Sequence, residues 1–294
     1  MTLNTHRVTS GKICLHAVTQ GNPDGIPLVL VHGYPDNHSV WDKVVDALEQ
    51  EYFLIRYDVR GAGLSDKPLH TRDYRLSLLA KDLEAVVGQL LPDRKFHILA
   101  HDWGSIQSWE SVGAGPLQER ILSFTSISGP CLDHMASWLT AQASSFTRHG
   151  FARVTKQLVK SWYVFLFQVP AIPEAIWNMG LYKQWPAFLK KREGIVDACS
   201  SKLQKDDGRF GVRLYRANVL PRLLRPQPRF ATCPVQLIIP KYDNYVGEDI
   251  FCGLDQWVEK LTRVQINAPH WAPLTEPEVI ASAVRNFTYP QRVP

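Results

Sequence analysis

The sequence of 294 residues lacks the marks of several classes of protein. It has only 5 cysteines, widely scattered and without a CxxC pair, so neither a disulfide framework nor a zinc site is indicated. No apolar run approaches the ~18–20 residues that a membrane span requires, and the N-terminus has no apolar stretch typical of a secretory signal. Because no GxGxxG motif occurs, we expect no nucleotide cofactor, and we expect no metal. These absences favour a cytoplasmic protein.

Charge is small overall but unevenly distributed. The net charge of +5 does not require a nucleic acid partner, and we expect none. Residues 131–229 hold 16 Lys and Arg against 6 Asp and Glu, whereas the rest of the chain is slightly acidic. A composition shift of this size indicates domain boundaries. We therefore predict an α/β core in residues 1–130 and 230–294, with a helical cap inserted at 131–229.

Short apolar runs alternate with helical patterns on both sides of the basic segment. Continuous apolar strands separated by helices are typical of a parallel sheet covered on both faces, so the fold class is α/β. The basic segment has no such alternation and contains a long helical run at 151–167. The predicted strands lie at residues 28–33, 52–58, 96–101, 121–128, 234–240 and 263–268.

The segment Ala100-His101-Asp102-Trp103-Gly104 follows one of these strands and has the pattern of a nucleophile elbow with Asp102 at its tip. Small residues two positions before and after the tip allow the tight strand–turn–helix that such an elbow needs. The dipole of the following helix favours an ionised carboxylate. The simpler alternative is that Asp102 only caps that helix.

Three further strand ends carry polar groups that complete the chemistry. The turn His32-Gly33-Tyr34-Pro35 can aim the backbone N–H of Tyr34 at the elbow beside that of Trp103, which would form an oxyanion hole. Asp243 follows the strand at 234–240, and His270 follows the last strand. An Asp in a loop and a lone His are commonly structural. The order Asp102, Asp243, His270, each at a strand end, is nevertheless that of nucleophile, acid and histidine in α/β-hydrolases.

These motifs give the chain a clear family resemblance. HGYPD, DVRGAGLSD, AHDWGS and APHWAPLTEP resemble the epoxide hydrolase branch of the α/β-hydrolase superfamily over nearly the whole chain. In particular, the chain resembles the hydrolase half of bacterial two-domain proteins that fuse an epoxide hydrolase to a short-chain dehydrogenase. The resemblance implies an eight-stranded, mostly parallel core sheet with an inserted helical cap. It also implies a cis peptide before Pro35.

The resemblance extends to two motifs in the predicted cap. Members of this branch carry two cap tyrosines above the nucleophile, and the matching residues here are Tyr163 in SWYVFLFQVP and Tyr215 in LYRAN. Taken singly, each tyrosine is more simply a packing residue of a lid. The expected substrate pocket includes His32, Pro35 and Trp271. Aromatic cap residues favour an apolar, bulky or long-chain substrate; they are Trp138, Trp162, Trp177 and Trp185.

The resemblance predicts hydrolysis of an apolar or lipid epoxide to a vicinal diol, through an ester on Asp102. Two alternatives stay open at this point, a haloalkane dehalogenase and a non-catalytic binding protein on the same scaffold. The basic cap fits contact with an anionic membrane surface or with a partner domain, although a solvated lid surface is the simpler interpretation.

Overall fold

The computed structural model describes residues 3–197 and 201–289 and contains one eight-stranded sheet. The strand order is β1-β2-β4-β3-β5-β6-β7-β8. The strand β2 pairs antiparallel with β1 and with β4, and all other pairs are parallel. The expected eight-stranded, mostly parallel sheet is therefore confirmed. The strands are β1 Asn4–Ser10, β2 Ile13–Gly21, β3 Ile26–Val31, β4 Tyr52–Tyr57, β5 Phe96–His101, β6 Ile121–Ile127, β7 Val235–Pro240 and β8 Leu261–Ile266.

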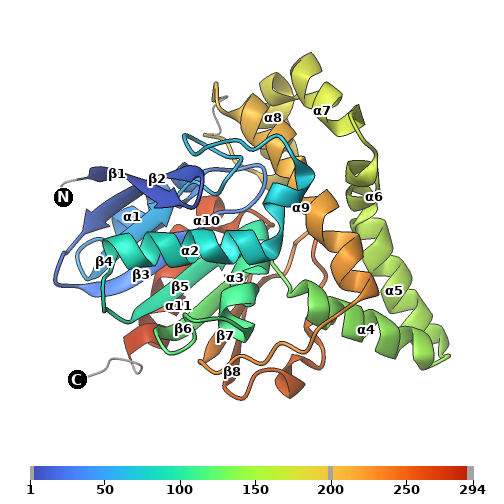
Figure 1. Cartoon of the computed structure of the whole chain (residues 1–294). Helices are drawn as coiled ribbons and strands as arrows, with labels where there is room; N and C mark the ends of the chain where they lie inside the picture. The colour runs from blue at the N-terminus through green and yellow to red at the C-terminus, as the bar shows by residue number, and fades with distance from the viewer. Residues whose placement is uncertain (1–2, 198–200, 290–294) are drawn as a thin grey trace.

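Helices cover both faces of this sheet. The central strands β3 and β5 are almost entirely buried, which explains why they are continuous apolar runs rather than alternating ones. On one face pack α2 (Leu76–Leu90) and α3 (Trp103–Gly113), and on the other pack α1 (Asp42–Leu48) and α11 (Pro277–Thr288). A short helix, α10 (Ala272–Thr275), precedes α11. Figure 1 shows the helices α2 and α3 on the near side of the sheet.

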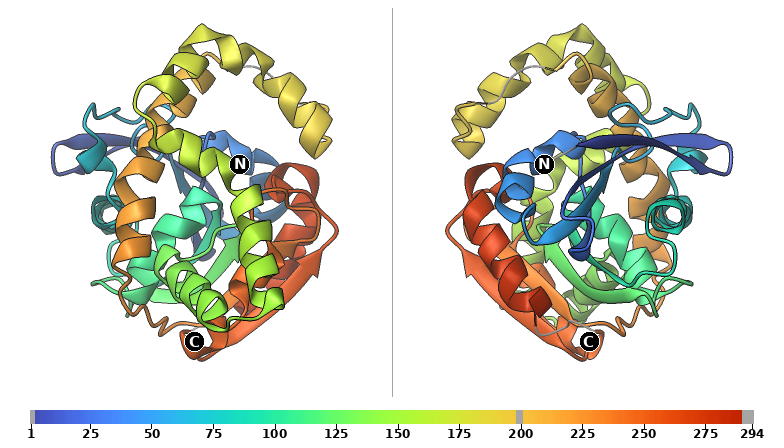
Figure 2. Two further views of the ribbon diagram at one scale, coloured as in Figure 1. Left: turned by 90° about the vertical axis from the view of Figure 1, so that its right-hand side faces the viewer. Right: turned by 90° about the vertical axis from the view of Figure 1, so that its left-hand side faces the viewer.

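The chain between β6 and β7 forms the cap. Its described part contains helices and no β-strand, apart from an isolated bridge at Ala231. The yellow-green to yellow segments in Figure 2 form an arch beside the core. The run predicted as one helix at 151–167 is broken at Ser161, between α5 and α6. The domain boundaries at 131 and 229 stay a prediction, and residues 198–200 lie outside the described residues. The helices are α4 Leu132–Ser144, α5 Arg148–Lys160, α6 Trp162–Gln168, α7 Ile172–Ile176, α8 Tyr182–Glu193 and α9 Gln204–Leu224.

The topology brings the sequence motifs to one edge of the sheet. The strands β3, β5, β7 and β8 are parallel, so the segments that follow them leave the sheet at the same edge. These segments carry Tyr34, Asp102, Asp243 and His270. Helices of the cap contribute further residues at this edge. In the described part of the chain, no helix has the length and apolar character needed to cross a membrane.

Candidate active site

Asp102 lies at the tip of a tight bend between β5 and α3. Its backbone has φ 50° and ψ −122°, a conformation that a non-glycine residue adopts only under strain. The bend requires glycine at two neighbours. A Cβ on Gly104 would lie 2.0 Å from the Val31 carbonyl oxygen, and one on Gly33 would lie 2.5 Å from Asp102 Oδ2. The glycines therefore allow β3 and the bend to approach each other closely.

The Asp102 carboxylate is buried and is held by a hydrogen bond from the backbone. Its Oδ2 accepts a hydrogen bond of 2.8 Å from the N–H of Tyr34, while the side chain makes no capping bond to α3. The simpler interpretation, that Asp102 only caps the helix that follows it, therefore does not account for this side chain. Burial raises the pKa of Asp102, whereas His270 and the N–H groups of Tyr34 and Trp103 act in the opposite direction. The peptide before Pro35 is cis, as expected.

His270 lies between two carboxylates. Its Nδ1 donates to Asp243 Oδ2 over 2.9 Å, and its Nε2 lies 3.7 Å from Asp102 Oδ1. Burial alone would lower the pKa of His270, but Asp243, together with Asp102 and Glu193, raises it to about 9. The imidazole is therefore protonated near neutral pH as long as Asp102 carries its charge.

Asp243 is fixed by its own loop and by the cap. Its Oδ1 accepts hydrogen bonds of 2.7 and 2.9 Å from the N–H groups of Tyr245 and Val246. Burial would raise the pKa of Asp243, but His270 and these two donors lower it overall. From α5, Gln157 donates to the Tyr245 carbonyl and Lys160 donates to that of Asp243, over 3.0 and 2.5 Å. The acid is thus held ionised with one oxygen free for the histidine.

Two residues that the sequence analysis did not single out hold the backbone of His270. The carboxylate of Glu193, in the last turn of α8, accepts from the His270 N–H over 2.9 Å. The ring Nε2 of His101 donates to the His270 carbonyl over 2.9 Å. Burial lowers the pKa of His101 to about 3 and raises that of Glu193, with His270 opposing the latter shift. The signal for His101 was its place in the AHDWGS motif, whereas nothing in the sequence marked Glu193.

The two cap tyrosines lie against the bend. Tyr163 comes from α6 and Tyr215 from α9, and their rings meet edge to face with centroids 5.9 Å apart. Tyr215 also contacts the ring of Trp103. Burial raises the pKa of both phenols well above their ordinary value. The next largest cause is the negative charge of Asp102 for Tyr163, and the neighbouring Tyr163 for Tyr215. Both hydroxyls are therefore protonated and can donate hydrogen bonds at neutral pH.

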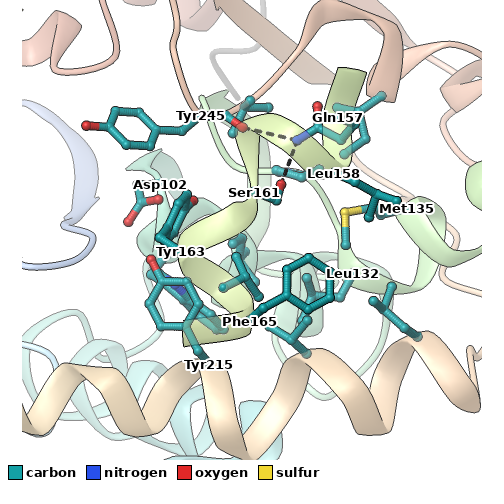
Figure 3. A pocket seen from close by; sticks show the side chains of 18 of the residues that line it. Asp102, Leu132, Met135, Gln157, Leu158, Ser161, Tyr163, Phe165, Tyr215 and Tyr245 are labelled. Atoms are coloured by element: carbon teal, nitrogen blue, oxygen red, sulfur yellow. Dashed lines mark hydrogen bonds between the residues drawn. The ribbon is translucent and has the colours of Figure 1, made fainter. Parts of the chain in front are cut away.

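Two cavities meet at these residues. Asp102, Tyr163, Tyr215 and Tyr245 line both a cavity of about 110 Å³ and a second one of about 600 Å³. Figure 3 shows Asp102, Tyr163 and Tyr215 together at one end of the smaller cavity, with apolar side chains such as Leu132 at the other. A ligand at Asp102 can therefore extend in two directions away from the tyrosines.

The expected pocket residues divide into two groups. Pro35 and Trp271 line the larger cavity, as do Trp162, Trp177 and Trp185. His32 lines neither cavity beside Asp102, so its assignment to the pocket was wrong. Its Nδ1 lies 2.8 Å from the Gly33 carbonyl and its Nε2 accepts from the Val59 N–H, so this buried ring holds the turn. Trp138 is buried and also lines neither cavity.

One cluster outside this site has side chains that could bind a metal. His16, His38 and Asp58 place one ligand atom each within 4.8 Å of one another. Both oxygens of Asp58 already accept two hydrogen bonds, from the rings of the two histidines and from the N–H groups of His38 and Leu64. The cluster is therefore explained as a hydrogen-bonded turn, and the cavities beside Asp102 present no comparable ligand set within the described residues.

The fold and sequence are similar to those of known hydrolases. The profile of the family described as alpha/beta hydrolase fold matches residues 26–277. "Probable oxidoreductase EphD" of Mycobacterium tuberculosis is 35% identical over 277 residues, covering 91% of this chain and 46% of that protein. The chain thus spans about half the length of this relative. "Epoxide hydrolase 1" of Caenorhabditis elegans is 30% identical over 292 residues, covering 94% of this chain and 68% of that protein.

A solved structure shows the same fold. The crystal structure of Bacillus megaterium epoxide hydrolase in complex with an inhibitor superimposes with a TM-score of 0.80 at 19% identity, covering 97% of this chain and 100% of that one. The resemblance inferred from the sequence motifs is therefore confirmed, although the link to a two-domain arrangement stays a prediction. The chain belongs to the α/β hydrolase fold family, with relatives in its epoxide hydrolase branch.

Proposed function

We propose that this protein is an epoxide hydrolase that converts an apolar epoxide to a vicinal diol through an ester on Asp102. One observation carries the proposal. Two protonated tyrosines, half-buried Tyr163 and buried Tyr215, line the same cavities as the carboxylate that is paired with His270. Opening an epoxide requires a nucleophile at carbon and an acid at oxygen, and this arrangement offers both. The relatives named epoxide hydrolase support the same reaction.

The first half-reaction uses Asp102 and the cap tyrosines. A carboxylate oxygen of Asp102 attacks one epoxide carbon, the carbon–oxygen bond breaks, and a phenol of Tyr163 or Tyr215 gives its proton to the leaving oxygen. The product is a hydroxyalkyl ester of Asp102. Because the raised pKa values keep both phenols protonated, two hydrogen bonds are available to the opening ring.

The second half-reaction uses His270. Esterification removes the negative charge of Asp102, which is one of the groups that raise the pKa of His270, so the imidazolium then loses its proton more readily. Neutral His270 takes a proton from water, and the hydroxide attacks the ester carbonyl of Asp102. The N–H groups of Tyr34 and Trp103 stabilise the oxyanion. Collapse of this tetrahedral intermediate breaks the ester bond and releases the alkoxide of the diol, which takes the proton from His270. The Asp102 carboxylic acid that remains then ionises, and its proton restores the tyrosine phenol that was deprotonated in the first half-reaction.

Two other readings of the site predict different outcomes. In a haloalkane dehalogenase the leaving group is a halide, which needs no proton, so the tyrosines would have no chemical role. The position after His32-Gly33 is Tyr34, whose hydroxyl accepts from the Trp177 indole over 2.8 Å and so is already engaged. A non-catalytic binding protein would leave the pairing of Asp102 with His270 and Asp243 without a use.

The proposal is tested with styrene oxide and 1-chlorobutane as parallel substrates. We expect diol from styrene oxide, no chloride release from 1-chlorobutane, and no diol from the Asp102→Ala variant. Asp46→Ala, which removes an exposed carboxylate of α1, is the matched control and keeps the wild-type rate. Diol formation by Asp102→Ala, chloride release in place of diol, or ligand binding without diol over hours would each contradict the proposal.

The partner of the basic cap is a further proposal. The cap exposes large apolar side chains near its basic residues, among them Phe151, Trp162 and Phe165, and this combination favours an anionic membrane surface. We expect salt-sensitive binding to vesicles that contain anionic lipid and none to neutral vesicles. Absence of binding at low salt would leave the solvated lid surface as the explanation.

A further inference from the structure

One polar side chain of the cap is buried in an otherwise accessible helix. All residues of α5 are described, and of these only Gly150 and Gln157 are buried. Gln157 is 8% exposed and belongs to the wall of the smaller cavity beside Asp102. Burying an amide costs free energy unless its polar atoms find hydrogen-bond partners. The partners of Gln157 therefore indicate what this side chain does.

The amide of Gln157 is fully engaged with two other segments of the chain. Its Nε2 donates to the Tyr245 carbonyl over 3.0 Å and to the Ser161 hydroxyl over 2.9 Å. Its Oε1 accepts from the N–H of Gly247 over 3.0 Å. Figure 3 shows the bonds to Tyr245 and Ser161 as dashed lines. Both N–H donors and the oxygen of the amide thus have a partner.

The first of these segments is the acid loop, residues 243–247. The N–H groups of Tyr245 and Val246 donate to Asp243 Oδ1 within this loop. The Tyr245 ring packs edge to face on the ring of His270, with centroids 4.7 Å apart. A contact that anchors the acid loop therefore fixes both the donors that hold the acid and a ring that touches the histidine.

The second segment is the break between α5 and α6. Ser161 lies at this break, and its carbonyl accepts from the Val164 N–H. Tyr163 follows two residues later, in the first turn of α6, and its ring meets that of Tyr245 edge to face with centroids 5.6 Å apart. A contact that anchors Ser161 therefore supports the tyrosine that donates a proton in the proposed reaction.

We propose that Gln157 is a positioning residue that joins the acid loop to the cap helix carrying Tyr163, so that one side chain supports both half-reactions. This inference rests on the proposed function, because it assigns a role in that reaction. A misplacement of a catalytic group by about 1 Å can slow a reaction by about 10²-fold. Loss of the Gln157 bonds should therefore slow formation and hydrolysis of the ester together, whereas replacement of a single catalytic group affects mainly one step.

The test breaks the contact from either side. Gln157→Leu keeps a side chain of similar size without the amide. Gly247→Ala leaves Gln157 in place, but the added Cβ would lie 2.9 Å from Gln157 Oε1, so the amide has to move. The backbone of Gly247 has φ −81° and ψ 146°, which an alanine adopts without strain. Rapid quench over a range of styrene oxide concentrations gives the rate constant of each step and the dissociation constant of the epoxide.

We expect Gln157→Leu to lower both rate constants at saturating styrene oxide by about tenfold, with little change in the dissociation constant. Gly247→Ala should also slow both steps. The double variant should be no slower than Gln157→Leu, because both substitutions break one contact. Thr155→Ala is the matched control, since Thr155 is an exposed residue of α5 that lines neither cavity, and it should keep the wild-type rate constants.

The outcomes separate this inference from the proposed function. If Gln157→Leu keeps both rate constants, changes only the dissociation constant or slows only one step, the positioning role is overturned. Independent addition of its effect to that of Gly247→Ala overturns it as well. Gly247→Ala decides alone if Gln157→Leu does not fold. In each of these cases wild-type protein still forms ester and diol, so the epoxide hydrolase assignment stands. If wild-type protein forms neither, the proposed function fails and this inference fails with it.

Discussion

The core and the cap meet at the same site but are built differently. In the core, Asp102, Asp243 and His270 are 6%, 4% and 3% exposed. Backbone N–H groups donate to the carboxylates of Asp102 and Asp243, and the His270 ring donates to that of Asp243. In the cap, Trp162 is 64% exposed and Phe146 is 84% exposed. The core therefore supplies groups of fixed geometry, whereas the cap supplies a surface that meets ligands and solvent. The cap nevertheless contributes the two tyrosines and Glu193, so this division is open to direct test.

The largest effect is expected when both cap tyrosines are replaced together. Tyr163→Phe and Tyr215→Phe should each slow formation of the ester by about 10²-fold to 10³-fold, because each removes one hydrogen bond to the developing alkoxide. The double variant should lose almost all ester formation. Rapid quench followed by intact-protein mass measurement reports this step. Tyr242→Phe, which alters an exposed tyrosine that lines neither cavity, is the control, and a double variant with near wild-type rate would remove the cap from the chemistry.

Replacing the core histidine should block the other half of the reaction. In His270→Gln the ester should form but hydrolyse about 10²-fold to 10⁴-fold more slowly, because no base then activates the water. The protein should therefore accumulate with its mass increased by that of one epoxide. Free, unmodified His270→Gln protein after incubation with substrate would show that the histidine is needed before the ester forms.

The same substitution tests the charge of the core site through stability. The folded-state pKa of His270 is raised to about 9 from an unfolded value of 6.5, so its protonated form stabilises the fold fully below pH 6.5. This contribution, on the order of 3 kcal/mol, is lost as pH rises through about 9. The difference in free energy of unfolding between wild type and His270→Gln should shrink over that window, measured by urea denaturation. A difference independent of pH would contradict the raised pKa.

The smallest effect is expected from the cap residue that touches the core. Glu193→Gln keeps an acceptor for the His270 N–H but removes a negative charge, so the pKa of His270 should fall. In the ester, neutral His270 would then be available at lower pH, and the acid limb of the hydrolysis rate should move to lower pH. Glu193 would act as a positioning residue through His270. A rate that changes equally at all pH values would instead indicate a purely structural contact.

The core was largely predictable from the sequence because its signals are local. The apolar runs of the central strands and the small residues around Asp102 reflect constraints within a few positions of each other. The parallel topology then predicted that Asp102, Asp243 and His270, each at the end of a strand, lie at the same edge of the sheet. His32 shows the limit of this reasoning, since its place in the HGYP turn did not tell whether the ring faces the cavity or the turn.

The cap was less predictable because its signals depend on tertiary contacts. Glu193 stands next to Lys190, Lys191 and Arg192, a context typical of a solvated helix end, and only docking of α8 beside His270 buries it. Tyr163 lies among many aromatic residues, and only the family resemblance distinguished it.

The most direct test of the account follows the oxygen of water through one turnover. Wild-type protein in excess over epoxide is incubated in heavy-oxygen water, and the label is located by mass spectrometry in the diol and in the peptide that contains Asp102. We expect the label in the Asp102 carboxylate and an unlabelled diol. Label in the diol after this single turnover, with Asp102 unlabelled, would mean that water attacks the epoxide directly and that no ester forms.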